Sequence, residues 1–126
     1  MRRMWIGIGL LALMLVGGLW AADWMQQAHG EMAADLNRGA QLALENRWEE
    51  AERQADRAER AWQKKRPVTA AFADHEPLEE IDGLFAQLRI FAAAGKGADF
   101  AATCGYLAQQ LEALGDDHRF TLYNLL

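Results

Sequence analysis

The sequence predicts an all-α protein, with one N-terminal transmembrane helix followed by an antiparallel bundle of about four helices. Residues 4–22 form an apolar run without a charged side chain. Beyond that run the chain has only two prolines, and its apolar residues recur at the three- and four-residue steps of a helix. We therefore expect two parts, an N-terminal anchor over residues 1–23 and a helical bundle domain over residues 24–126.

The apolar run has the length of a membrane-spanning helix. At ~1.5 Å per residue it covers roughly 28 Å, close to the ~30 Å hydrocarbon core of a bilayer. Trp5, Trp20 and Trp24 lie near its two ends, where indole rings prefer the headgroup layer. The sequence thus predicts that residues 4–22 contact the bilayer.

An uncleaved anchor fits this segment better than the two alternatives. A cleaved signal peptide ends in small residues, but cleavage after Ala22 would leave Trp20 at the third position before the cut. Attachment of a lipid needs a cysteine just past the run, whereas the single cysteine is Cys104. Because Arg2 and Arg3 precede the run, we expect a single-pass protein of the cell membrane with a cytoplasmic N-terminus and an extracytoplasmic bundle.

The charge of the bundle excludes one class of partner. All 18 acidic residues and 11 of the 13 basic residues follow the apolar run, which gives this part a formal charge of −7. Nucleic-acid binding needs basic patches that neutralise phosphate, and an acidic domain does not lie flat on anionic lipid. One cysteine also cannot form an internal disulfide, so the bundle depends on packing.

The first bundle helix should continue from the anchor or start just after it, and a break follows around Asn46, a residue that tolerates the left-handed conformation of helix ends. In the next helix Glu49 with Arg53, and Asp56 with Arg60, are oppositely charged pairs four residues apart, in the order that favours a helix. The apolar stripe of this second helix consists of Trp48, Ala51, Ala55, Ala58 and Trp62.

Pro67 should end the second helix, and a loop of about seven residues should lead to Asp74 as the N-cap of the third helix. That helix should end at Gly95, and a fourth should run from Asp99 to Gly115. The predicted apolar faces are Leu78, Ile81, Leu84, Phe85, Leu88 and Phe91 in the third helix, and Phe100, Cys104, Leu107, Leu111 and Leu114 in the fourth. The apolar tail, residues 120–126, should fold back as a short helix.

One cluster of metal-ligating residue types lies at the start of the third helix. His75 and Glu79 are four residues apart, the spacing by which one helix face offers two metal ligands. A zinc-protease helix has a second histidine where this chain has Glu79, and Pro77 lies inside the motif. We interpret the cluster as an acid-rich first turn, with His75 packed or hydrogen-bonded there, and keep a metal or ligand site at His75 and Glu79 as the alternative.

The remaining candidate residues have structural interpretations. Trp48 and Trp62 fit a helical core stripe better than a ligand pocket, and Asn124 can cap or clamp a neighbouring turn. The chain contains no serine, and Cys104 falls on a buried face. We therefore expect no catalytic residues, no cofactor and no enzymatic activity.

Several of these segments, in this order and spacing, resemble one bacterial family of small membrane-anchored helical proteins, the domain-of-unknown-function family 4363. The matching elements are Trp48-Glu49-Glu50-Ala51, Trp62 with Lys64 and Lys65, His75 with Glu79 to Asp82, and the ending Asn124-Leu125-Leu126. The resemblance implies a helical bundle behind a single anchor. It highlights Trp48, Trp62, His75 and Asn124, but it implies no activity for them.

From the sequence we therefore expect a non-enzymatic, membrane-anchored interaction or accessory module. Its partner would be a membrane protein or a second copy of the chain. The alternative function is an outward-facing ligand- or metal-binding domain that uses His75 and Glu79.

Overall fold

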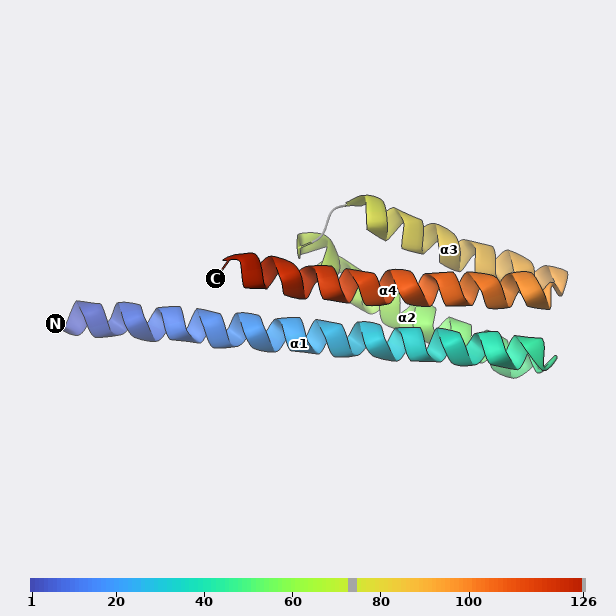
Figure 1. Ribbon diagram of the computed structural model, residues 1–126, viewed down its shortest axis with the longest axis horizontal. Coiled ribbons are helices and arrows are strands. Elements are labelled where there is room, and N and C mark those ends of the chain that lie inside the picture. The colour runs from blue at the N-terminus through green and yellow to red at the C-terminus, as the bar shows by residue number, and fades with distance from the viewer. Residues whose placement is uncertain (73–74, 126) are drawn as a thin grey trace.

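The computed structural model of the chain is all-helical, as predicted from the sequence. It describes the backbone of residues 1–72 and 75–125, and their side chains except those of 22, 25, 26, 72 and 115–125. The helices of this part are α1 (Arg2–Leu44), α2 (Trp48–Phe72), α3 (His75–Ala94) and α4 (Gly97–Leu125), as Figure 1 shows.

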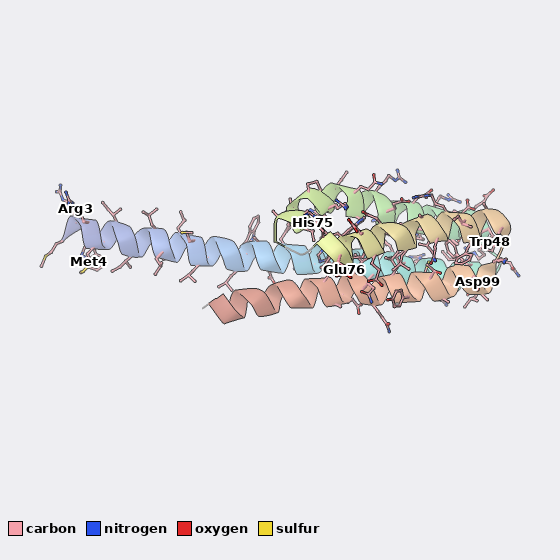
Figure 2. All side chains as sticks on the ribbon, turned by 90° about the horizontal axis from the view of Figure 1, so that it is seen from above. Arg3, Met4, Trp48, His75, Glu76 and Asp99 are labelled. Atoms are coloured by element: carbon pink, nitrogen blue, oxygen red, sulfur yellow. The ribbon has the colours of Figure 1, made fainter. Side chains whose placement is uncertain are left out.

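Helix α1 joins the N-terminal apolar segment and the bundle in one uninterrupted helix of 43 residues. Its N-terminal segment, Arg2–Ala21, is apolar and long enough to cross a membrane, and none of it is buried in the protein. In Figure 2 the N-terminal part of this segment extends beyond the other helices, and its side chains project on all sides. The first bundle helix is thus the continuation of the apolar helix, the first of the two possibilities expected from the sequence.

The C-terminal half of α1 packs with the other three helices as an up-down-up-down bundle (Figures 1 and 2). Helix α1 contacts α4 and α2 along most of their lengths, α3 rests on α4, and α2 and α3 touch each other least. The four-helix antiparallel arrangement predicted from the sequence is confirmed. Its weakest seam is the one between α2 and α3.

The core follows the predicted apolar faces. In α2 the small side chains of Ala51, Ala55 and Ala58 are buried together with Trp62, while Trp48 is partly buried. All the inward residues predicted for α4 are buried, and four of the six predicted for α3, with Leu84 and Phe91 partly buried.

Two helix ends have the left-handed residue that the sequence predicts. Gly95, at φ 67°, donates its N–H to the carbonyl of Ala92, and Lys96 donates to Phe91. Asn46, at φ 61°, follows α1 and donates its N–H to the carbonyl of Ala43, and Arg47 donates to Leu42. This is the Schellman arrangement that satisfies the last carbonyls of a helix.

The prediction that Pro67 ends the second helix is wrong, because α2 continues to Phe72 and the expected seven-residue loop does not form. Proline has no backbone N–H to donate, but two other interactions stabilise the turn around it. The buried Thr69 hydroxyl donates to the carbonyl of Lys65 at 2.9 Å, and Arg66 pairs with Asp82 of α3. Asp74, the predicted N-cap, lies outside the described residues.

The predicted end of the last helix is also wrong. Helix α4 begins at Gly97, two residues before Asp99, and runs through Gly115 to Leu125 as a single helix. Its C-terminal end extends beside the apolar half of α1 in Figure 1. Glycine interrupts a helix at a cost of only about 1 kcal/mol, so the tail continues the helix and does not fold back.

Candidate functional site

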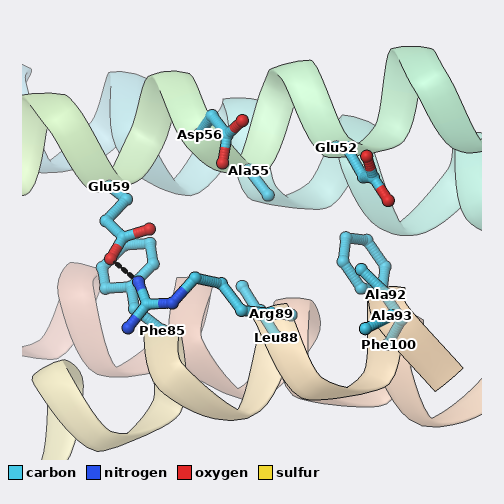
Figure 3. A pocket seen from close by; sticks show the side chains of 10 residues that line it. All are labelled: Glu52, Ala55, Asp56, Glu59, Phe85, Leu88, Arg89, Ala92, Ala93 and Phe100. Carbon is cyan, nitrogen blue, oxygen red and sulfur yellow. Dashed lines mark hydrogen bonds and ion pairs between the residues drawn. The ribbon is translucent and has the colours of Figure 1, made fainter.

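A groove follows the seam between α2 and α3. Two adjoining hollows form it, of about 230 Å³ and about 410 Å³, and they share Glu59, Phe85 and Arg89. The hollow drawn in Figure 3 lies between α2 and α3, with α4 behind it. Its lining consists of Glu52, Ala55, Asp56, Glu59, Phe85, Leu88, Arg89, Ala92, Ala93 and Phe100. We call both hollows together the α2–α3 groove.

The groove is open because small side chains face each other across it. Ala55 of α2 and Ala92 of α3 leave space that larger residues would fill, so Phe85, Leu88 and Phe100 form an apolar floor. The walls are charged and come mainly from α2. An apolar floor with convergent polar groups is the usual composition of a binding site.

One end of the groove contains a hydrogen-bonded cluster around Asp82. The Nε1 of Trp62 donates to Oδ1 of Asp82 at 2.7 Å, and Nε of Arg66 donates to Oδ2 at 2.8 Å. The ring of Trp62 is buried, with 1% of its surface exposed, so the carboxylate satisfies an indole N–H that lies next to the core. This cluster joins α2 to α3 on the side where their apolar contacts are few.

The middle of the groove is bridged by an ion pair between Glu59 of α2 and Arg89 of α3, drawn as a dashed line in Figure 3. The Glu59 side chain is 18% exposed and the Arg89 side chain 57% exposed. A pair as open as this contributes little to stability.

The distal end of the groove has two acids without a cation. Glu52 and Asp56 are exposed on α2 and form no ion pair within the described part of the chain. The predicted pairs of Glu49 with Arg53 and of Asp56 with Arg60 are wrong in detail, since each arginine donates to the backbone carbonyl of its partner. The sequence periodicity locates these residues correctly but does not decide which oxygen accepts.

The site residues predicted from the sequence are not brought together. Trp62 lines the groove, whereas Trp48 lies near the far end of the bundle and packs edge-on against Phe100, with ring centroids 5.6 Å apart. His75 and Glu79 are both exposed on α3. The described residues contain no group of three metal-ligating side chains. The side chain of Asn124 lies outside the described residues.

Cys104 is buried on the inner face of α4, as the sequence predicts. Burial raises the pKa of its thiol to about 12, so the nucleophilic thiolate is scarce at neutral pH. The sequence reasoning did not single out Glu59, Arg66 or Arg89. The predicted burial of Trp62 could have pointed to this cluster, because a buried indole N–H needs a hydrogen-bond acceptor, which a facing helix can supply.

The fold and the groove together define a class of protein, a small helical bundle built on the extension of an N-terminal apolar helix. The chain belongs to a family whose model is described as a domain of unknown function, DUF4363, and which matches residues 19–125. The resemblance seen in the sequence is therefore confirmed. No curated protein and no solved structure matches the chain.

Proposed function

We propose that the protein is a membrane-anchored, non-enzymatic interaction module whose α2–α3 groove binds a basic amphipathic helix of a membrane-protein partner. The anchor is Arg2–Ala21, with the N-terminus in the cytoplasm and the bundle outside. The observation that carries the proposal is the groove, whose apolar floor lies beside Glu52 and Asp56, two acids that form no ion pair within the described residues.

The spacing of the acids favours a helical partner. Glu52, Asp56 and Glu59 lie four and three residues apart on α2, so they form one row along the wall of the groove. A partner helix with Lys or Arg at the same steps would face each of them in turn. Its apolar residues would cover the floor formed by Leu88 and Phe100.

The rigidity of α1 supports a partner that is itself in the membrane. Because α1 has no break between the apolar segment and the bundle, the groove has a fixed height above the bilayer. A juxtamembrane segment of another membrane protein is already held near that height. It therefore loses little further translational and rotational freedom when it binds the groove.

The test is site-specific photo-crosslinking in intact cells with the tagged full-length chain. A photoreactive amino acid at Ala93, exposed in the groove, should form a defined product with one membrane protein. The product should vanish in the charge-reversed variant Glu52→Arg/Asp56→Arg. It should persist in Glu112→Arg, a single charge reversal at an exposed position of α4 outside the groove lining.

Mass spectrometry of the crosslinked peptide decides among the outcomes. A site in a basic helical segment of the partner supports the proposal. A product that is insensitive to the charge reversal, or crosslinks only between copies of the chain, would overturn the proposed partner. Circular dichroism of each variant checks that loss of the product does not reflect unfolding.

A further inference from the structure

The C-terminal end of α2 lies level with the end of the apolar segment of α1. The Nζ of Lys65 sits 3.0 Å from the centroid of the Trp24 ring. Trp24 is three residues past Ala21, where the apolar segment ends, which corresponds to ~4.5 Å along the helix axis. The headgroup layer on each side of a bilayer is roughly 5–7 Å thick. If α1 spans a membrane, Lys65 therefore lies in that layer.

Two ammonium groups at this level have no carboxylate partner. Arg66 is neutralised by Asp82, but Lys64 and Lys65 form no ion pair within the described residues. Lys64 is exposed and Lys65 half-buried against Trp24. The nearest acid in sequence to Trp24 is the exposed Asp23, and it does not pair with either lysine.

The same turn of α2 exposes apolar surface. Val68 is 42% exposed, one turn after Lys64, and Pro67 is exposed beside it. An indole, two lysines and a small apolar surface are the combination found where proteins meet the headgroup layer, because the rings and alkyl stems enter it while the charges reach phosphate. The exposed carboxylate of Glu76, at the start of α3, lies at the same end of the bundle (Figure 2), so contact with an anionic surface is confined to the turn of α2 that carries the two lysines.

We propose that Lys64 and Lys65 bind the phosphate groups of anionic lipids in the leaflet next to the bundle. Each ammonium donates to phosphate oxygens, and Trp24 keeps the Lys65 side chain at headgroup level. This contact holds the base of α2 on the membrane and fixes the rotation of the bundle about α1. The inference rests on the anchoring part of the proposed function and is independent of the groove.

The test uses the chain's three lysines, with Lys96 as an internal control, because Lys96 is exposed after α3 at the opposite end of the bundle. The full chain is inserted into vesicles of phosphatidylcholine, with or without phosphatidylglycerol. Labelling by an amine-reactive ester is then measured by mass spectrometry. Phosphatidylglycerol should slow the labelling of Lys64 and Lys65 by about fivefold, the change that the surface attraction of one lysine corresponds to. Lys96 should be unaffected.

A second measurement removes the charges. In mild detergent, Lys64→Gln/Lys65→Gln should retain less phosphatidylglycerol in native mass spectrometry than the natural chain, whereas Lys96→Gln should retain as much. Equal labelling in both vesicles would overturn the proposal, as would protection of Lys64 and Lys65 by inorganic phosphate alone. Protection of the segment Arg2–Ala21 from protease is measured in parallel. If this segment is cleaved, the proposed membrane anchor is overturned as well. If it is protected but the lipid has no effect, only this inference is overturned.

Discussion

At the scale of single residues, the polar groups of Thr69, Thr103 and Trp62 that enter the helix interfaces each donate to a nearby acceptor. Thr69 and Thr103 donate to carbonyls four residues back, at 2.9 Å in each case. Trp62 instead reaches across to Asp82. Satisfying a buried donor prevents a loss of about 1–3 kcal/mol, so the bond to Asp82 contributes to the position of α3 beside its apolar contacts.

The buried thiol of Cys104 should make the free energy of unfolding depend on pH. Because burial raises its pKa from 9.0 to about 12, the unfolded chain ionises the thiol at a lower pH than the folded chain. The stabilising effect is complete below about pH 9 and is lost as the pH rises toward 12. We expect the free energy of unfolding to fall by roughly 1 kcal/mol more between about pH 8 and about pH 10 than in Cys104→Ala.

The measurement is urea unfolding of both chains in mild detergent at the two pH values. Taking the difference between the chains removes the contribution of lysines and tyrosines, which titrate in both. Parallel pH dependences for the two chains would show that the thiol is not desolvated in the folded state.

At the scale of elements, the helices are specified by their ends more than by their interiors. Left-handed residues stop α1 and α3, whereas Gly30, Pro67 and Gly115 do not stop the helices that contain them. A glycine ends a helix where its positive φ lets two backbone bonds close the last turn. In a helix interior its cost is small and neighbouring helices offset it.

A pair of glycine-to-alanine substitutions tests this difference. A Cβ at Gly30 would meet no atom within 4 Å, so Gly30→Ala should raise the free energy of unfolding by about 0.5–1 kcal/mol. Gly95 has φ 67°, a conformation that costs an L-residue roughly 1–2 kcal/mol, so Gly95→Ala should lower it. Urea unfolding monitored by circular dichroism measures both, and changes of the same sign would contradict this account.

At the scale of the whole molecule, α1 is one rod of about 65 Å by its length and rise, half apolar and exposed, half built into the bundle. The position of any residue of α1 relative to the end of the apolar segment is therefore set by the helix rise, and the helices packed on α1 are held at the height of their contacts with it. This is why Lys65 and the groove have fixed heights above the proposed bilayer.

We predict the orientation of α1 relative to the two sides of the membrane. Arg2 and Arg3 should hold the N-terminus in the cytoplasm, so a phosphatase that is active only outside the cytoplasm should be active when fused after Leu126. A fluorescent protein that matures only in the cytoplasm should stay dark at the same position. Replacing both arginines by glutamate should weaken this bias, and a bright fusion with an inactive phosphatase would reverse the proposed topology.

The sequence by itself determined the all-α class, the N-terminal apolar segment, the buried faces and the two left-handed helix ends. These features depend on periodicity and on local backbone preferences, which are properties of short segments. The stripe from Ala51 to Trp62 and the cap at Gly95 are examples, since each can be read within a few turns of helix.

Only the tertiary structure decided where helices continue and which side chains meet. Local rules end a helix at Pro67 and at Gly115, but helix α2 continues where α3 and a threonine hold its turn, and α4 continues along α1. The groove is a further case, because it exists where Ala55 and Ala92 from separate helices face each other. Its ion pair between Glu59 and Arg89, and the bond from Trp62 to Asp82, join residues far apart in the chain, so no local pattern identifies the partners.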